Sequence, residues 1–119
     1  MERIAIIGLG LIGGSIGLAL KRAGLKDVRI AGTARTRDTV QRAKKLGAID
    51  DDARTAAEAV RDARLVIVAA PILATRAVFE EIAPVLMPGA VVTDVGSTKG
   101  NVMRWAKELL PDTIHFVGG

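Results

Sequence analysis

A stretch of 17 residues without a charged side chain, residues 4–20, constrains the fold of this 119-residue chain more than any other segment. It begins as a short apolar run, passes through Gly8-x-Gly10-x-x-Gly13 and continues as a helix-like segment. A strand, a glycine turn and a helix in this order form the half-site that binds the pyrophosphate of a dinucleotide. The segment therefore predicts the start of a dinucleotide-binding fold.

Five positions in this turn have a physical role in that prediction. Gly8 permits the tight turn, Gly10 lets the backbone approach the phosphates, and Gly13 lets the helix lie close to the strand. The backbone N–H groups around Leu11 and Ile12 would point at the anion from the positive end of the helix dipole. We therefore expect these five residues to bind a cofactor without the help of a basic side chain.

The same stretch has an alternative interpretation as a membrane helix or a signal-peptide core, because it contains Gly10-xxx-Gly14 and Gly13-xxx-Gly17. At about 1.5 Å per residue, its 17 residues reach only about 25 Å, whereas a hydrocarbon core is about 30 Å thick. Its five glycines would each cost about 1 kcal/mol in a helix interior. We therefore expect no membrane association.

Composition limits the remaining classes of protein. The chain is 50% hydrophobic and 25% charged, as expected of one globular domain. The absence of cysteine excludes disulfides, thiolate catalysis and Cys-based zinc sites, and it fits a cytoplasmic location. We expect no metal site, because there is one histidine, His115, and the consecutive carboxylates of Asp50-Asp51-Asp52 on a solvated turn cannot all face one ion.

The net charge of +4 and the pI near 10.0 raise the possibility of a nucleic-acid partner. The 17 basic residues are scattered, however, and the only aromatic residues are Phe79, Trp105 and Phe116. No basic stripe is interleaved with rings on which bases could stack. We therefore expect a solvated basic surface that attracts small anionic metabolites, and no nucleic-acid binding.

Short apolar runs alternate with helix-like segments along the whole chain. Strands are expected at residues 3–7, 28–34, 48–49, 65–70, 90–94 and 114–117, and helices from the glycine turn to Gly24, at 36–46, 55–60, 73–85 (with Pro84 as a stop) and 101–110. The apolar run at 65–70 is typical of a central strand buried on both faces. The pattern predicts a single α/β domain with a doubly wound parallel sheet, that is, a Rossmann-like fold.

The segment after the second expected strand has no carboxylate between Asp27 and Asp38. In NAD-binding folds an Asp or Glu at this place accepts hydrogen bonds from the ribose hydroxyls. Arg35 can instead stack on adenine and pair with a 2′-phosphate, which favours NADP(H) over NAD(H) as the cofactor. The further candidate donors are Thr33, Thr36 and Arg37. Two alternatives stay open: the arginines simply begin an exposed helix, or Asp38 turns back to the ribose.

A second polar loop, Gly96-Ser97-Thr98-Lys99-Gly100, follows an expected strand that ends at Asp94. It lies at the carboxyl edge of the sheet, where such folds bind their ligands, so we prefer a ligand-binding role to that of a simple helix cap. A hydrolase triad of Ser97, His115 and Asp94 is disfavoured, because the serine lacks the first glycine of a G-x-S-x-G turn.

Several of these segments together resemble one enzyme family. The chain contains, in this order, GLGLIGGSIGLALKRAG, LGAID, VIVAAP, IAPVLMPGAVVTDVGSTKG and FVGG. In these segments it is similar to the prephenate and arogenate dehydrogenases, the oxidoreductases of tyrosine biosynthesis. The resemblance implies a Rossmann-like domain followed by a helical domain that dimerises and completes the substrate site. It also implies oxidation of prephenate or arogenate by NAD(P)⁺ with loss of CO₂.

The resemblance assigns further roles. Ala70 and Pro71 would line the cofactor cleft, while Gly96 and Ser97 would lie beside the nicotinamide, with Ser97 as the catalytic candidate. In the family this serine hydrogen-bonds a catalytic histidine in the motif F-V-G-G-H-P, and the present sequence ends at the second glycine, Gly119.

We therefore expect residues 1–119 to be the nucleotide-binding domain, truncated before the His-Pro motif and inactive by itself. A homodimer would form through the missing helical domain. The alternatives are a β-hydroxyacid or imine-type dehydrogenase and a non-catalytic NAD(P)-sensing module.

Overall fold

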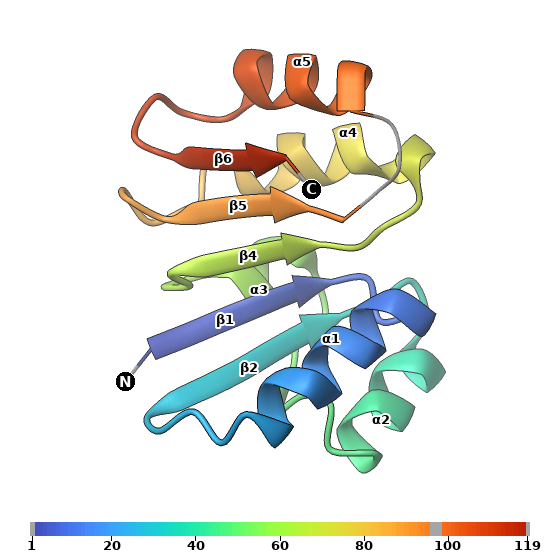
Figure 1. Ribbon diagram of the computed structural model, residues 1–119. Coiled ribbons are helices and arrows are strands. Elements are labelled where there is room, and N and C mark those ends of the chain that lie inside the picture. Colours follow the sequence, from blue (N-terminus) through green and yellow to red (C-terminus); the bar gives the residue numbers. More distant parts are fainter. Residues whose placement is uncertain (1, 96–98, 119) are drawn as a thin grey trace.

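The computed structural model describes residues 2–95 and 99–118, which form a six-stranded parallel sheet with helices on both faces (Figure 1). The strands are β1 (Glu2–Ile7), β2 (Val28–Thr33), β3 (Asp51–Asp52), β4 (Leu65–Val68), β5 (Val91–Asp94) and β6 (His115–Gly118). The helices are α1 (Leu11–Arg22), α2 (Arg37–Lys45), α3 (Ala56–Val60), α4 (Ile72–Ile82) and α5 (Lys99–Leu109).

The strands lie in the order β3-β2-β1-β4-β5-β6, which is the order of the doubly wound dinucleotide-binding fold. Strand β1 pairs in parallel with β2 on one side and with β4 on the other, so the direction of winding reverses between β1 and β4. The expected fold class is therefore confirmed.

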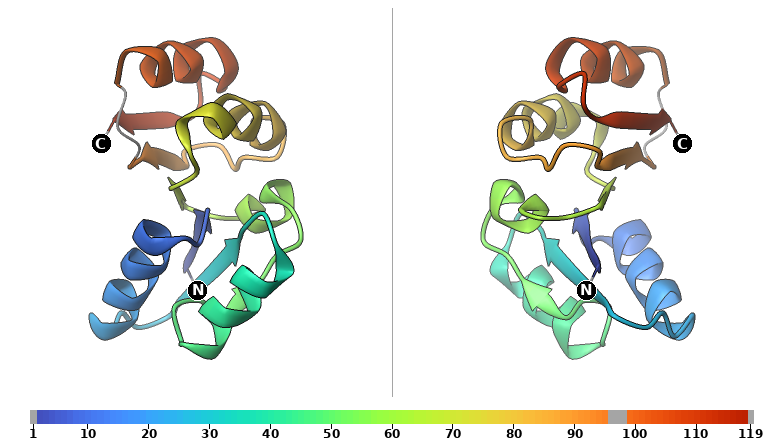
Figure 2. Two further views of the ribbon diagram at one scale, coloured as in Figure 1. Left: turned by 90° about the vertical axis from the view of Figure 1, so that its right-hand side faces the viewer. Right: turned by 90° about the vertical axis from the view of Figure 1, so that its left-hand side faces the viewer.

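Two buried hydrophobic clusters lie between the sheet and the helices, one on each face. On one face, Ile6 and Ile30 of the sheet pack with Val40 of α2 and with side chains of α1. On the other face, Val92 packs with Phe79 of α4 and with residues of α3 and α5. Figure 2 shows the resulting arrangement, with α1 and α4 on opposite sides of the strands. Strand β4 is the expected central strand, because three of its four residues are buried.

The helix ends follow from local sequence. Gly24 and Gly47 follow the last residues of α1 and α2 with φ of +65° and +81°, conformations that glycine adopts without strain. At the other ends, the hydroxyl oxygen of Thr36 accepts from the backbone N–H of Thr39 (3.3 Å), and Thr55 begins α3 in the same way. Helix α4 ends at Ile82, before Pro84 as expected.

The predicted position of the third strand was wrong. It was expected at residues 48–49 with a solvated acidic turn after it, but Ala48 and Ile49 are buried in a connection, and Asp51–Asp52 form the strand beside β2. The physical reason is packing. Helix α1 lies directly on the connection, since a Cβ on Gly17 would be 2.4 Å from the carbonyl oxygen of Ala48. Ala48 and Ile49 are therefore buried beneath α1. Pairing with β2 therefore starts later.

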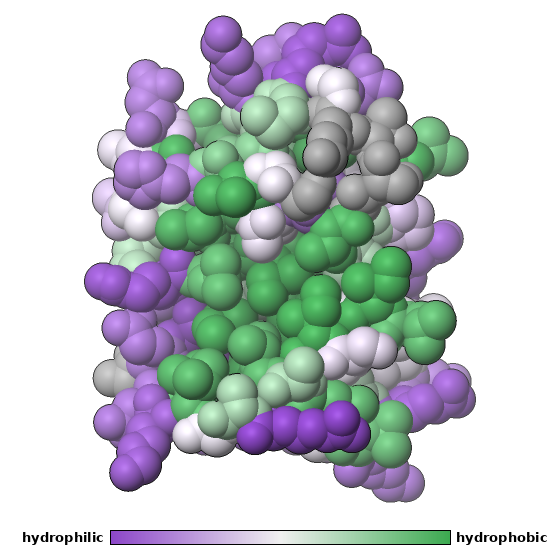
Figure 3. All heavy atoms as spheres, in the orientation of Figure 1, coloured by the Kyte–Doolittle hydropathy of each residue, from purple (hydrophilic) through white to green (hydrophobic). Residues whose placement is uncertain are grey.

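A band of apolar residues crosses the middle of the face seen in Figure 3, between α1 and α5. In and beside strands β4, β5 and β6, Leu65, Val91 and Val95 are partly buried and Val117 is exposed. None of the helices in the described residues is long and apolar enough to cross a membrane. The charge-free stretch of the sequence is divided between a strand, a turn and most of α1.

Candidate functional site

The glycine turn between β1 and α1 is shaped by close backbone contacts. Gly8 has φ of +100°, and its N–H donates to the carbonyl oxygen of Thr33 at 2.9 Å. A Cβ on Gly8 would lie 2.7 Å from the carbonyl oxygen of Ala69, and a Cβ on Gly13 would lie 1.8 Å from that of Gly8. The expected tight turn at Gly8 and the close helix packing at Gly13 are confirmed.

The amino end of α1 is open to solvent. Gly10 begins the helix, and a Cβ on it would meet no heavy atom of the described residues within 4 Å. The side chains of Leu11 and Ile12 are 89% and 57% exposed. No side chain in the described part of the chain caps the helix, and its first turn carries no acidic residue, so the backbone N–H groups there are available to an anion.

A cavity of about 290 Å³ adjoins this turn at the carboxyl edge of the sheet. It lies at the point where the winding reverses, which is where open α/β sheets bind their ligands. Three segments form its walls: the ends of β1 and β2, the connection between β3 and α3, and α4 with the residues before it. The lining residues are Ile7, Gly8, Thr33, Ala34, Arg35, Arg54, Thr55, Ala56, Ala70, Pro71, Ala74, Val78 and Glu81.

The structure brings together some of the expected site residues and separates others. Thr33, Arg35, Ala70 and Pro71 line the cavity beside Gly8. The cavity lining does not include Thr36 and Arg37, and both have other partners. The hydroxyl of Thr36 caps α2, while the Arg37 guanidinium lies 2.7 Å from the carboxylate of Asp52.

Two charged residues of the cavity, Arg54 and Glu81, are not predicted by the sequence. Glu81 is on α4, and its Oε2 accepts from the backbone N–H of Ala57 at 2.9 Å. Arg54 follows the end of β3 by two residues, as Arg35 follows the end of β2. A third strand at residues 48–49 would end five residues before Arg54, so the sequence did not predict that Arg54 and Arg35 take equivalent positions after neighbouring strands.

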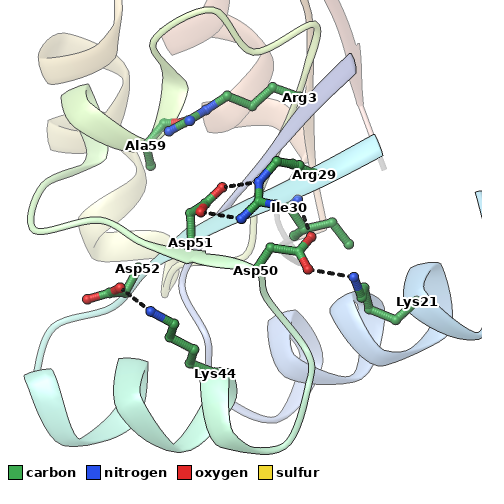
Figure 4. A network of polar contacts seen from close by, with 9 residues as sticks. All are labelled: Arg3, Lys21, Arg29, Ile30, Lys44, Asp50, Asp51, Asp52 and Ala59. Atoms are coloured by element: carbon green, nitrogen blue, oxygen red, sulfur yellow. Dashed lines mark hydrogen bonds and ion pairs between the residues drawn. The ribbon is translucent and has the colours of Figure 1, made fainter. Parts of the chain in front are cut away.

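The three consecutive aspartates pair with basic side chains from three elements, α1, β2 and α2. Figure 4 shows three of these side chains, Lys21, Arg29 and Lys44. Lys21 lies 2.6 Å from Asp50, and Arg29 lies 2.7 Å from Asp51. Arg37 and Lys44 lie 2.7 and 3.0 Å from the two oxygens of Asp52. We call Asp50, Asp51 and Asp52 with these four cations the aspartate clasp. Among the described residues, no group of three or more His, Cys, Asp or Glu is placed to hold a metal ion.

The clasp keeps its carboxylates ionised. Hydrogen bonds from Arg37 and Lys44 place the pKa of Asp52 far below its ordinary value of 3.8. The hydrogen bond from Arg29 lowers the pKa of Asp51. Burial opposes ionisation of Asp50, but the hydrogen bonds from Lys21 and from the N–H of Ile30 outweigh it, so the pKa of Asp50 is also lowered.

The expected nicotinamide-side loop is described only at its ends. Gly96 and Ser97 lie outside the described residues, as does Thr98. Asp94 is 3% exposed at the end of β5, whereas His115 is exposed at the start of β6. In the register of these strands His115 is opposite Val91, so it and Asp94 point to opposite faces of the sheet. This arrangement argues against the Ser-His-Asp alternative.

Comparison with known proteins agrees with the fold. Residues 16–119 match the family model for the prephenate dehydrogenase nucleotide-binding domain. A prephenate dehydrogenase of Bacillus subtilis (strain 168) is 41% identical over an alignment of 119 positions, which covers 99% of this chain and 32% of that protein. The chain thus spans about a third of the length of the curated relatives it matches.

Two solved structures are similar over nearly the whole chain. Prephenate dehydrogenase from A. aeolicus, in complex with hydroxyphenyl propionate and NAD⁺, has a TM-score of 0.87 at 28% identity over 99% of this chain and 41% of that one. Synechocystis arogenate dehydrogenase has a TM-score of 0.86 at 29% identity, over 98% of this chain and 40% of that one. The chain therefore belongs to the prephenate dehydrogenase family, in the part that corresponds to the nucleotide-binding domain.

Proposed function

We propose that residues 1–119 are the cofactor-binding domain of an NAD(P)-dependent dehydrogenase that oxidatively decarboxylates prephenate or arogenate. The observation that carries this proposal is the open amino end of α1 at Gly10, next to a cavity at the point where the winding reverses. Family membership and the A. aeolicus relative that contains NAD⁺ support it.

The proposed pyrophosphate site is made of main chain. Gly8 turns the chain, Gly10 leaves room for the phosphates, and Gly13 keeps α1 against the turn. The N–H groups of Leu11 and Ile12 would donate to the phosphate oxygens. Because these donors are held by the fold, binding requires little reorganisation.

The proposed adenosine site is the cavity. Ala70 and Pro71 are apolar lining residues that would contact the adenine ring, and the polar lining residues Thr33 and Arg35 would contact the ribose and its phosphate. We favour NADP(H), because Arg35 stands near the place where NAD-binding folds carry a ribose-binding carboxylate. Thr36 and Arg37 would add to this site only by leaving the helix cap and the aspartate clasp.

The proposed chemistry is loss of a hydride and of CO₂ from the ring, which makes the product aromatic. The bound nicotinamide would supply the hydride acceptor. In the sequence, Gly96 and Ser97 come between β5 and α5. We assign Ser97 to the reacting ring and to orientation of a general base from a further segment, on the family resemblance alone. Cytoplasmic location and a homodimer are part of the same proposal.

Nucleotide titration followed by calorimetry tests this function. The wild-type chain is expected to bind NADPH, and more tightly than NADH. Arg35→Ala is expected to weaken NADPH binding about tenfold or more, the effect of losing a charge-assisted hydrogen bond, with little change for NADH. If the wild-type chain binds neither nucleotide, the proposal is wrong.

A further inference from the structure

Arg35 and Arg54 occupy equivalent positions at the ends of two neighbouring strands. Strands β2 and β3 pair in parallel, with Ala31 opposite Asp51 and Gly32 opposite Asp52. Each arginine lies two residues beyond the last residue of its strand. Because parallel strands end at the same edge of a sheet, both arginines reach the same cavity, whose lining contains the two of them.

The two guanidinium groups have no competing partner among the described residues. Neither makes a hydrogen bond or an ion pair within residues 2–95 and 99–118. The basic side chains nearby differ in this respect, since the aspartate clasp holds all four of its cations. The four cations of the clasp are thus paired with aspartates, whereas Arg35 and Arg54 can bind an anion in the cavity.

The charge of the cavity favours an anion. Its lining contains two arginines and one carboxylate, Glu81. That carboxylate faces the start of α3, where its Oε2 accepts from the N–H of Ala57 at 2.9 Å. Two guanidinium groups can bind one phosphate through paired hydrogen bonds, because their planar forks match its oxygens.

We infer that Arg54 is a second specificity-determining residue for the cofactor and binds the 2′-phosphate of NADP(H) together with Arg35. This inference rests on the proposed function and deepens it, since it names the pair of residues that recognises one phosphate group. Arg37, the second arginine that the sequence suggested, is replaced in that pair by a residue from a different connection.

The test compares Arg54→Gln with Arg61→Gln, which removes the same charge from an exposed position that is not in the cavity lining. Calorimetric titration with NADPH and with NADH gives the readout for each protein. Arg54→Gln is expected to weaken NADPH binding by about tenfold or more and NADH binding by less than about twofold. Arg61→Gln is expected to bind both nucleotides as the wild type does.

The other possible results distinguish a failure of this inference from a failure of the proposed function. Unchanged NADPH affinity in Arg54→Gln, or an equal loss for both nucleotides, overturns the inference and leaves the proposed function standing. Wild-type preference for NADH overturns both the inference and the NADP assignment. Binding of neither nucleotide by the wild type overturns the proposed function as well. Because the Arg54 side chain has no partner in the described residues, the thermal unfolding of Arg54→Gln should match that of the wild type.

Discussion

At the scale of single residues, the five glycines of the first turn and helix differ in what a methyl group would meet. At Gly8, Gly13 and Gly17 a Cβ would lie 2.7, 1.8 and 2.4 Å from a backbone carbonyl oxygen. At Gly10 it would meet nothing within 4 Å, and at Gly14 only an ordinary contact of 3.8 Å. The crowded glycines are therefore explained by packing, whereas Gly10 has no such explanation within the described residues.

The substitution Gly10→Ala distinguishes an effect on nucleotide binding from an effect on protein stability. We expect its free energy of unfolding to fall by no more than about 1 kcal/mol, because the added methyl group has room and only the lower N-cap preference of alanine opposes it. Its affinity for NADPH should fall about tenfold or more, because that methyl group would occupy the space proposed for the phosphates. Chemical denaturation and calorimetric titration measure the two quantities.

Gly14→Ala, in the same helix, is the matched control. It should gain about 0.5–1 kcal/mol of stability, because alanine is the better helix former, and keep its nucleotide affinity. Gly10→Ala that binds NADPH as tightly as Gly14→Ala does would contradict the proposed pyrophosphate site.

At the scale of elements, the aspartate clasp explains how a strand of two residues is held at the edge of the sheet. Asp51 and Asp52 add only a short ladder to β2. Their side chains, with that of Asp50, bind cations from α1, β2 and α2. Ion pairs at such exposed positions each contribute little, but together they orient the connection that carries Arg54.

The clasp predicts a specific loss of stability in acid. Because its carboxyl groups have lower pKa values in the folded chain than their ordinary 3.8, they stabilise the fold above about pH 4. That stabilisation is lost as the pH falls through the lowered values. Urea unfolding from about pH 5 to about pH 2 should therefore show a shallower decline for Asp52→Asn than for the wild type.

Asp112→Asn is the control for this measurement, because Asp112 is exposed and makes no ion pair among the described residues. It should lose stability in acid as the wild type does. An identical acid dependence for Asp52→Asn and the wild type would show that the clasp does not contribute.

At the scale of the whole molecule, the strand order places the glycine turn, the cavity and the carboxyl end of β5 along one edge of the sheet. The chain nevertheless spans only 32% and 33% of two curated relatives. A cofactor site can therefore be complete here while the substrate site and the general base depend on other residues.

We expect the 119-residue chain to bind NADPH without turning over prephenate or arogenate by itself. The nucleotide should raise its unfolding temperature, since a ligand at about 100 times its Kd adds about 2.7 kcal/mol of stability. Steady-state assays that follow reduction of NADP⁺ with each substrate measure turnover. Robust activity of the chain alone would contradict the assignment of catalysis to a longer protein.

The sequence by itself determined the features that depend on neighbouring residues. The alternation of apolar runs and helical segments predicted the parallel α/β fold, and the spacing of Gly8, Gly10 and Gly13 predicted the turn. The lack of a carboxylate after β2 predicted a binding role for Arg35, which lines the cavity. These features were predictable because backbone conformation and burial leave a periodic pattern in the chain itself.

Only the tertiary structure decided which side chains meet. A strand of two residues has no periodic signal, so the end of β3 and the position of Arg54 came from its pairing with β2. The sequence predicted that Arg37 binds the cofactor, but in the structure Arg37 pairs with Asp52, which is 15 residues away. Such partners are determined by packing between segments that are distant in the sequence, and this packing produces no local sequence pattern.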